Sequence, residues 1–322
     1  MERKNLQDRA SLLADVAEMY YLEQKNQAEI AKAVGVTRSM ISRMLSEARE
    51  SGIVEIRIQR PLQSDPELEH ALKEYFGLKD VFVVSTNQPG GDRLTQTLGS
   101  AGARMLERYL APHKVLGLAW GTSISATVDA YETKEPMQVK VVQLVGAMGA
   151  RNMEYDGHDL VARITEKLGG EAYYLNAPYI AQNAEMARSL LETKSIRETI
   201  SIGRKTDVAL LGIGTTSPEY SSFYLAGYVT RRELEDLRKA GAIGDVCGQH
   251  FDVNGQPACD DFCARLVSIR RSDLLSIPVR LGVAGGEGKA DAILGALRSR
   301  YVNVLVTDSM AARKVLELAK SP

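Results

Sequence analysis

The feature that most constrains this chain is the stretch from Gln27 to Leu45, whose residue types fall at the offsets that two helices crossing through a tight turn require. Ala31 is small enough to let a second helix cross the first, and Gly35 can take the positive φ with which a chain leaves a helix. Thr37 can then accept a backbone N–H from the first turn of the next helix. The pattern predicts a helix-turn-helix, a unit that reads the major groove of DNA.

The two faces of this predicted unit differ in polarity. Apolar side chains recur at three- and four-residue spacing and can be buried together: Ile30, Val34, Ile41, Met44 and Leu45. The candidate DNA-binding residues are polar: Gln27, Thr37, Arg38, Ser39, Ser42 and Arg43, with Arg49 further along. Arginine paired with guanine is the commonest specific contact of a recognition helix. The alternative is an ordinary helical hairpin with solvated arginines, but such a hairpin does not need the small residue, the glycine and the cap together.

The chain is long enough for two domains, because its 322 residues exceed what one hydrophobic core usually serves. A helix over residues 11–22 can cover the helix-turn-helix with Leu12, Leu13, Val16, Met19 and Tyr20. The residues Ile53, Val54, Ile56 and Ile58 predict a short strand that suits a small wing or a connector strand. We therefore expect a winged helix-turn-helix domain over residues 1–60, a linker over 61–66 and a second domain over 67–322, opened by a helix that ends at Gly77.

Charge and composition narrow the class of protein further. The formal net charge is −1, so DNA binding must rest on local placement of charge and on several copies acting together. The amino terminus lacks the features of a secretory signal and no apolar run reaches membrane-spanning length, so we expect a cytoplasmic protein with no membrane partner. Cys247, Cys259 and Cys263 fit reduced thiols. Zinc sites favour a different spacing from that of Cys259 and Cys263, so no metal and no cofactor are predicted.

The second domain alternates apolar strands with helical patterns. The predicted strands are short, rich in valine or leucine, and followed by glycine or polar turns: 81–84, 115–120, 139–145, 208–213, 281–284 and 302–306. Helices such as Arg93 to Leu110 and Lys289 to Arg298 lie between them. This pattern predicts a doubly wound α/β domain with a parallel sheet, in which ligands bind at the carboxyl ends of the strands.

Two loops at predicted strand ends are candidates for binding a phosphate. Gly121, Thr122 and Ser123 follow a strand and open a helix, so backbone amides, hydroxyls and the helix dipole can converge on an anion. The second loop, which includes Gly285, Gly286 and Lys289, has the same position and adds an ammonium group. Either loop alone is equally compatible with simple turn chemistry. Two of them in one sheet favour a phosphorylated ligand.

Several of these motifs together resemble a known family over nearly the whole chain. They are the helix-turn-helix, the loop Trp120-Gly121-Thr122-Ser123, the stretch Gly244-Asp245-Val246-Cys247 followed by Phe251-Asp252 and Gly255, and the ending VAGGEGKADAILGALRSRYVNVLVTDSMAA. The chain closely resembles the SorC/DeoR-type sugar-binding transcriptional regulators. The resemblance implies a winged helix-turn-helix joined to a Rossmann-like effector domain similar to ribose-5-phosphate isomerase and glucosamine-6-phosphate deaminase. It also implies a regulator, expected to be a repressor of a carbohydrate-utilisation operon, that binds double-stranded operator DNA and a phosphorylated sugar and assembles as a dimer or tetramer.

The resemblance also assigns roles to single residues. Gly121, Thr122 and Ser123 match the family's phosphate-binding loop, Lys289 matches its ligand-approaching lysine, and Asp245 matches its acidic residue that binds sugar hydroxyls. Some members carry, after a Val-Val-Gln-Leu strand, a lysine that forms an imine or an arginine that binds a second phosphate. This chain has Val145 there, which can do neither.

The preferred effector is therefore a singly phosphorylated sugar, or a phosphorylated polyol or related signal molecule. A contribution of Lys140 or Arg151 to its binding stays open. The main alternative function is an enzyme, because the second domain resembles sugar-phosphate isomerases and deaminases, and Asp245 with Lys289 could form a catalytic pair. A DNA-binding architectural protein is a third class, which the near-neutral charge disfavours. We expect a regulator with no catalytic residues.

Overall fold

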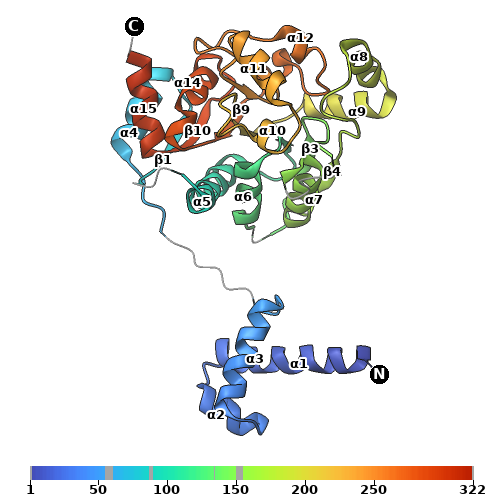
Figure 1. The fold of residues 1–322 in the computed structure, drawn as a ribbon, viewed down its shortest axis with the longest axis vertical. Coiled ribbons are helices and arrows are strands. Elements are labelled where there is room, and N and C mark those ends of the chain that lie inside the picture. The colour runs from blue at the N-terminus through green and yellow to red at the C-terminus, as the bar shows by residue number, and fades with distance from the viewer. Residues whose placement is uncertain (1, 55–60, 87–89, 134, 150–154, 321–322) are drawn as a thin grey trace. The chain divides into compact units, whose positions relative to one another are not determined.

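The computed structural model describes residues 2–54, 61–86, 90–133, 135–149 and 155–320 (Figure 1). Contacts divide the chain into two units, Met1–Pro61 and Leu62–Pro322. Among the described helices, none is both long and apolar enough to cross a membrane.

The first unit is built from three helices, α1 (Glu2–Tyr21), α2 (Gln27–Val34) and α3 (Arg38–Glu50). Its core contains the apolar residues expected from the spacing, with Val34 only partly buried: Leu13, Val16, Ile30, Ile41, Met44 and Leu45. The first helix is longer than predicted, since it begins at Glu2. Tyr20 does not cover the helix-turn-helix as expected, because its side chain is 37% exposed and the neighbouring Tyr21 packs against the core instead. The structure does not describe residues 55–60, so most of the strand predicted from Ile53 to Ile58 lies outside the described residues.

The turn between α2 and α3 has the predicted chemistry. Gly35 ends α2 with a φ of 76°, and the backbone N–H of Met40 donates to the Thr37 side chain over 3.3 Å. A second cap, absent from the sequence prediction, stands at the other end of α2. Asn26 and Glu29 form a reciprocal capping box there, for which the Asn-x-x-Glu spacing is the sequence signal. Both ends of α2 are therefore determined locally.

The second unit contains a sheet of seven parallel strands, as the α/β prediction required. The strands are β1 (Asp80–Val84), β2 (Val115–Leu118), β3 (Lys140–Gln143), β4 (Glu171–Tyr173), β5 (Val208–Gly212), β9 (Val279–Val283) and β10 (Val304–Asp308). Their order across the sheet is β1-β10-β9-β5-β2-β3-β4. The edge strand β4 was not predicted, because it is short and has a charged first residue.

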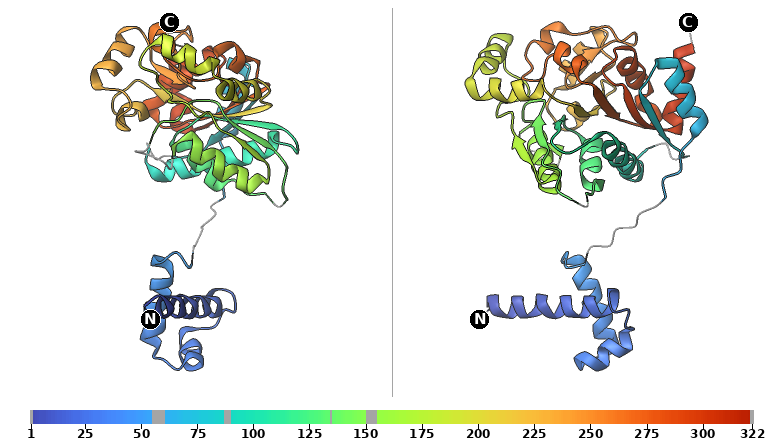
Figure 2. Two further views of the ribbon diagram at one scale, coloured as in Figure 1. Left: turned by 90° about the vertical axis from the view of Figure 1, so that its right-hand side faces the viewer. Right: turned by 180° about the vertical axis from the view of Figure 1, so that it is seen from behind.

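Helices cover both faces of this sheet (Figures 1 and 2). One face carries α5 (Asp92–Tyr109), α6 (Thr122–Ala130) and α7 (Gly157–Leu168), and the other carries α4 (Pro66–Phe76), α9 (Lys194–Gly203), α14 (Ala290–Arg298) and α15 (Ser309–Lys320). Successive strand residues enter opposite cores: Val141 packs with the α5–α7 layer, and Val142 packs with the other layer. This double burial explains why the strands are almost entirely apolar.

The segment between β5 and β9 is a long excursion from the main sheet, and its small sheet was not predicted from the sequence. It contains a small antiparallel sheet of β6 (Gly214–Thr215), β7 (Gly244–Val246) and β8 (Gln249–Phe251). The helices of the excursion are α10 (Ser222–Leu225), α11 (Arg231–Lys239), α12 (Asp260–Cys263) and α13 (Arg271–Ser276). Among the described residues, the unit also contains α8 (Ala184–Glu192) and the 3-10 helix η2 (Glu287–Lys289), which starts the helix predicted from Lys289.

The predicted linker is partly built into the second unit. Ser64 forms a bridge with Val84, and Asp65 accepts a hydrogen bond from the N–H of Leu68 at the start of α4. The predicted helix after the linker is present and ends at Gly77, which has a positive φ of 63°. The predicted domain limits at residues 60 and 67 stay a prediction.

Candidate functional site

A pocket lies where the strand order of the main sheet reverses. From β2 the chain continues to β3 and β4 on one side, whereas from β5 it continues to β9 and β10 on the other. Open α/β sheets bind ligands at such a switch point, outside the carboxyl ends of the strands. The pocket is lined by residues 119–124 after β2 and 212–215 at the end of β5, together with Ser222, Phe223, Asp245, Cys247 and Lys289.

The loop after β2 presents the amino end of α6 to this pocket. Gly121 has a φ of 123°, which few other residues adopt, and precedes the nine-residue α6. No side chain in the described ranges caps this helix, so N–H groups of its first turn can donate to an anion. The Gly121 N–H itself donates to the Tyr155 carbonyl over 3.1 Å. Thr122 and Ser123 line the pocket beside it.

Asp245 and Lys289 reach the same pocket from different elements. Asp245 is buried on β7, where its carboxylate accepts a hydrogen bond from the Gly248 N–H over 2.9 Å. It pairs in register with Gly214, and a Cβ at residue 214 would lie 2.1 Å from the carboxylate, so a side chain there would displace the Asp245 carboxylate. The ammonium of Lys289 donates to the Ile213 carbonyl over 3.3 Å. Burial lowers the pKa of Lys289, and the Asp245 carboxylate opposes this effect.

The second predicted phosphate loop is partly engaged in hydrogen bonds within the fold. Of that loop, Lys289 lines the pocket, whereas Gly285 and Gly286 do not belong to its described lining. The Gly286 N–H donates to the Asp308 carboxylate over 2.6 Å. The same carboxyl group accepts hydrogen bonds from the N–H groups of Met310 and Ala311 at the start of α15. This amide is therefore already paired within the fold.

Of the other residues considered for effector contacts, neither Val145 nor Lys140 belongs to the pocket lining. Val145 is fully buried and bridges to Ser268. Lys140 stands at the amino end of β3, which in a parallel sheet is the edge opposite the pocket, and its ammonium lies 6.0 Å from the centre of the Tyr173 ring. Arg151 lies outside the described residues.

The thiols and histidine near the pocket are held by packing. Cys247 lines the pocket and burial raises its pKa. Cys263 has its sulfur 3.9 Å from Nδ1 of His250, and burial raises the pKa of this thiol to about 11. Across the described residues, His, Cys, Asp and Glu side chains form no group of three or more that could hold a metal ion. Phe223 was not expected in the pocket, because it belongs to no local motif. Cys247 ends the Gly244–Cys247 stretch that contributes to the family resemblance, but its place in the lining was not predicted.

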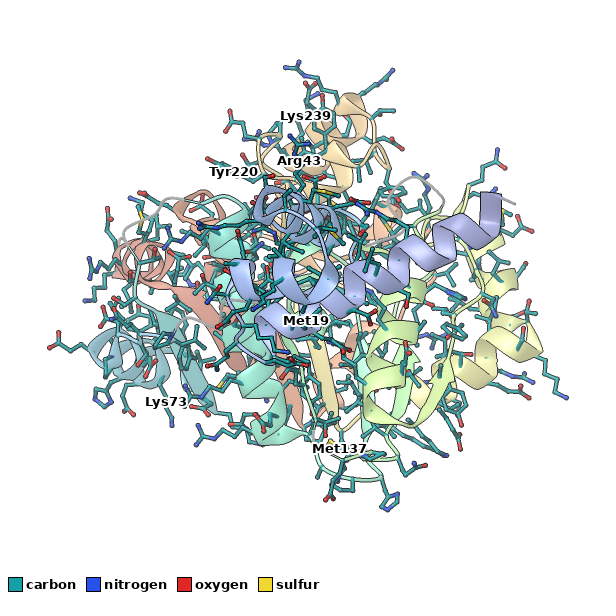
Figure 3. All side chains as sticks on the ribbon, turned by 90° about the horizontal axis from the view of Figure 1, so that it is seen from below. Met19, Arg43, Lys73, Met137, Tyr220 and Lys239 are labelled. Carbon is teal, nitrogen blue, oxygen red and sulfur yellow. The ribbon has the colours of Figure 1, made fainter. Side chains whose placement is uncertain are left out.

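The candidate DNA-binding residues of α3 lie on its exposed side. The side chains of Arg38, Ser39, Ser42 and Arg43 are exposed, as is Thr37, while Gln27 at the start of α2 is partly exposed. Within the described part of the chain, neither Arg38 nor Arg43 forms an ion pair with a carboxylate; Figure 3 labels Arg43. Glu47, further along α3, pairs with Arg9 of α1 over 2.6 Å and fixes the two helices together.

A family model described as "Putative sugar-binding domain" matches residues 60–317 of the chain. The protein belongs to the SorC/DeoR-type family of sugar-binding transcriptional regulators. The sorbitol operon regulator of Klebsiella pneumoniae is 30% identical to this SorC/DeoR-type chain over 312 residues, which are 96% of the chain and 99% of the relative. The deoxyribonucleoside regulator of Bacillus subtilis (strain 168) is 29% identical over 309 residues, covering 96% and 98%.

Solved structures agree with this assignment. The crystal structure of the full-length sorbitol operon regulator SorC from Klebsiella pneumoniae is similar to the SorC/DeoR-type chain with a TM-score of 0.72 and 30% identity, covering 97% of this chain and all (100%) of the other. These relatives are named as regulators, so the comparisons give no support to the enzyme alternative.

Proposed function

We propose that this regulator binds operator DNA through α3, and that a singly phosphorylated sugar or polyol in the pocket between β2 and β5 changes its affinity for that DNA. One observation carries the proposal. The amino end of α6, the carboxylate of Asp245 and the ammonium of Lys289 line a single pocket at the switch point of the sheet, in a chain that also has a helix-turn-helix.

The pocket's chemistry supports a ligand with one phosphate and several hydroxyls. The amino end of α6 and Lys289 can share a phosphate group, because each favours an anion. The Asp245 carboxylate accepts a hydrogen bond from the Gly248 N–H, and a carboxylate has room for about four, so it can also accept bonds from sugar hydroxyls. Lys289 is the one cation among the described lining residues, and Val145 adds no charge nearby, which favours one phosphate over two.

Regulation requires that ligand binding alter the DNA-binding form of the protein. In our proposal the protein is a cytoplasmic dimer or tetramer whose helix-turn-helix units are spaced for half-sites, and the effector favours an assembly with different spacing. Release of DNA by the effector would make the protein a repressor. The pocket then senses its ligand without converting it, and no residue has a catalytic role.

The experiment begins with the full-length protein selecting duplex DNA sites from a random-sequence library. Binding of the enriched site is then measured by fluorescence anisotropy for the wild type, Arg43→Ala, and the matched control Arg238→Ala, which removes an exposed arginine from α11. Loss of one arginine–base contact costs about 1–3 kcal/mol, so Arg43→Ala should bind roughly 5- to 150-fold more weakly, with the control unchanged. Equal binding by Arg43→Ala at physiological salt would refute the placement of the recognition helix.

The second half of the experiment adds aldose, ketose and polyol phosphates and their unphosphorylated partners to the protein–DNA complex. One phosphorylated compound should change DNA affinity and raise the melting temperature of the free protein, because it binds the folded state. Lys289→Met should keep DNA affinity and lose this response. A response that survives in Lys289→Met, or that occurs equally with the unphosphorylated compound, would contradict the proposed phosphate site.

A further inference from the structure

The pocket is too small for the ligand class proposed above. Its free volume is about 40 Å³. A single water molecule needs about 10–15 Å³ of such volume, so the space suits about three waters, whereas small-molecule pockets span roughly 300–1,000 Å³. A sugar phosphate can therefore enter only if part of the lining moves.

The lining elements differ in how firmly the backbone holds them. Asp245 lies on β7, which pairs with both β6 and β8. The loop after β2 is anchored through the Gly121 N–H, and Lys289 immediately precedes α14. Ser222 and Phe223, by contrast, belong to the segment from Ser217 to Val229, which we call the cover segment and which contains the four-residue helix α10.

The backbone of the cover segment is bonded almost entirely to itself. In the described part of the chain, the hydrogen bonds donated by backbone N–H groups from Tyr220 to Val229 end on acceptors within the segment, with donor–acceptor distances of 2.8 to 3.4 Å. They include Ser221 to the Ser217 carbonyl and Tyr228 to the Phe223 carbonyl. The segment is thus held to the rest of the unit chiefly by side chains. It can move as a piece without breaking a strand of either sheet.

Phe223 is the side chain that anchors the cover segment beside the pocket. It is 7% exposed, and its ring centre lies 5.2 Å from that of Trp120 and 5.4 Å from that of Tyr179, on which it stacks. The outer residues of the segment are far more exposed, with Leu225 at 67% and Tyr220 at 49% (Figure 3 labels Tyr220). Phe223 and Val229, which is 4% exposed, are the buried apolar side chains of the segment, and Tyr224 and Tyr228 pack beside them. Phe223 is the one of these that lines the pocket, so it supplies the contact that closes the segment there.

We propose that Phe223 is a plug that fills the space the effector's sugar takes, and that the cover segment swings outward as the effector enters. This inference rests on the proposed sensing function for its ligand, but the motion itself is a property of the free protein. Withdrawal of Phe223 leaves the rings of Trp120 and Tyr179 facing the vacated space. Aromatic faces of this kind suit the C–H face of a sugar, while the phosphate stays at the amino end of α6.

The motion is tested without any ligand. Hydrogen exchange with mass spectrometry gives the opening equilibrium of the cover segment. Iodoacetamide alkylates Cys247, which lines the pocket, and the alkylation rate of the peptide that contains it gives the opening of the pocket. The two opening constants should agree in the wild type. Phe223→Ala should raise both by about tenfold or more, because it removes the ring that docks the segment. Leu225→Ala, on the same helix but exposed, should change neither.

Two results would overturn the proposal. In one, Phe223→Ala speeds alkylation of Cys247 and leaves the exchange of the cover segment unchanged, which would mean that the mutation only widens a static pocket. In the other, Cys247 reacts at a rate unrelated to the segment's opening in the wild type.

A binding experiment with ligands distinguishes a Phe223 side chain that blocks the ligand from one that forms part of the binding wall. Glucose 6-phosphate, fructose 6-phosphate and ribose 5-phosphate are titrated into the wild type and Phe223→Ala. A plug must leave before the ligand binds, so its removal should tighten binding of any of these that bind the wild type. Weaker binding by Phe223→Ala would identify Phe223 as a wall and overturn the proposal. If none of the three binds either protein, the sensing function fails for these compounds, while exchange and alkylation still decide whether the cover segment opens.

Discussion

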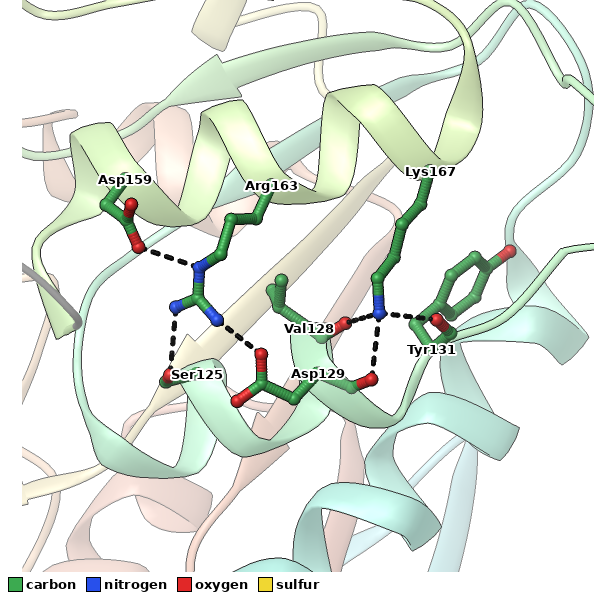
Figure 4. A network of polar contacts seen from close by, with 7 residues as sticks. All are labelled: Ser125, Val128, Asp129, Tyr131, Asp159, Arg163 and Lys167. Carbon is green, nitrogen blue, oxygen red and sulfur yellow. Dashed lines mark hydrogen bonds and ion pairs between the residues drawn. The ribbon is translucent and has the colours of Figure 1, made fainter. Parts of the chain in front are cut away.

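Lys167 on α7 holds the far end of the helix that opens at the pocket. Its ammonium donates to the backbone carbonyls of Val128, Asp129 and Tyr131, at distances of 2.8, 2.8 and 2.9 Å (Figure 4). These carbonyls stand at the carboxyl end of α6, where a helix lacks partners of its own and favours a positive charge. We predict that Lys167→Met, which keeps most of the aliphatic stem, destabilises the second unit.

The magnitude follows from the exposure of Lys167. Each hydrogen bond from a charged donor contributes about 1.5–3 kcal/mol when it is well buried, and a charge at a helix end contributes about 0.3–1 kcal/mol. Lys167 is only partly buried, so water can replace some of these bonds after the mutation. We therefore expect a loss of about 2 kcal/mol in the free energy of unfolding, well below the sum of three buried bonds.

Urea unfolding followed by tryptophan fluorescence measures this loss. Trp120 is the single tryptophan of the chain and lies in the second unit, so the signal reports that unit. The control is Lys314→Met, whose ammonium pairs with Glu317 over 3.0 Å at the surface of α15 and should change stability by less than about 0.5 kcal/mol. If Lys167→Met were as stable as this control, the three bonds to α6 would contribute nothing net, and the reasoning would be refuted.

Two further predictions concern the pocket and the turn. Burial lowers the pKa of Lys289, so this side chain loses its charge at a lower pH than an ordinary lysine does. Isothermal titration calorimetry should therefore show the affinity for the phosphorylated ligand falling as the pH rises through this pKa. An affinity that stays unchanged up to the usual lysine range would contradict a contact between Lys289 and the phosphate. Gly35→Ala should destabilise the first unit by about 1–2 kcal/mol, because its φ of 76° is unfavourable for alanine although nothing crowds the Cβ. Thermal unfolding by circular dichroism checks this, with Gly90→Ala as a control lacking both strain and crowding.

The helix-turn-helix and the main sheet were readable from the sequence because their signals are local. Gly35 and Thr37 mark the turn by conformation and capping, which depend on neighbouring residues alone. The strands buried on both faces stand out as apolar runs. The edge strand β4 and the small sheet β6-β7-β8 were missed, since their strands have only two or three residues and form through contacts distant in sequence.

The pocket was only partly predictable for the same reason. The Gly121–Ser123 loop could be found from its place between a strand and a helix, whereas Asp245 was named through the family resemblance. Ser222 and Phe223 carry no local sign of their position, because the segment between β5 and β9 brings them to the pocket. Cys247 stands two residues after Asp245 in a motif that contributes to the family resemblance, but nothing in that motif assigned it to the pocket. Gly286 matched a phosphate-loop pattern, but its N–H pairs with the Asp308 carboxyl group that also accepts hydrogen bonds at the start of α15.

The helix α6 has the proposed effector pocket at its amino end and Lys167 at its carboxyl end. Lys167 can therefore affect a bound ligand either through its charge or through the position of the helix. A nine-residue helix is about 13 Å long. Two unit charges at that separation interact by about 0.3 kcal/mol in water, and by about 1.3 kcal/mol at the effective dielectric constant of about 20 that suits groups in a protein. Physiological salt weakens this interaction further, because the separation exceeds the Debye length of about 8 Å. We expect Lys167 to act instead by fixing the direction in which the first-turn N–H groups point. Lys167→Met should then weaken binding of a sugar phosphate by an amount that persists at high salt. A defect that disappears as salt is added would instead show that the charge of Lys167 acts on the ligand through space.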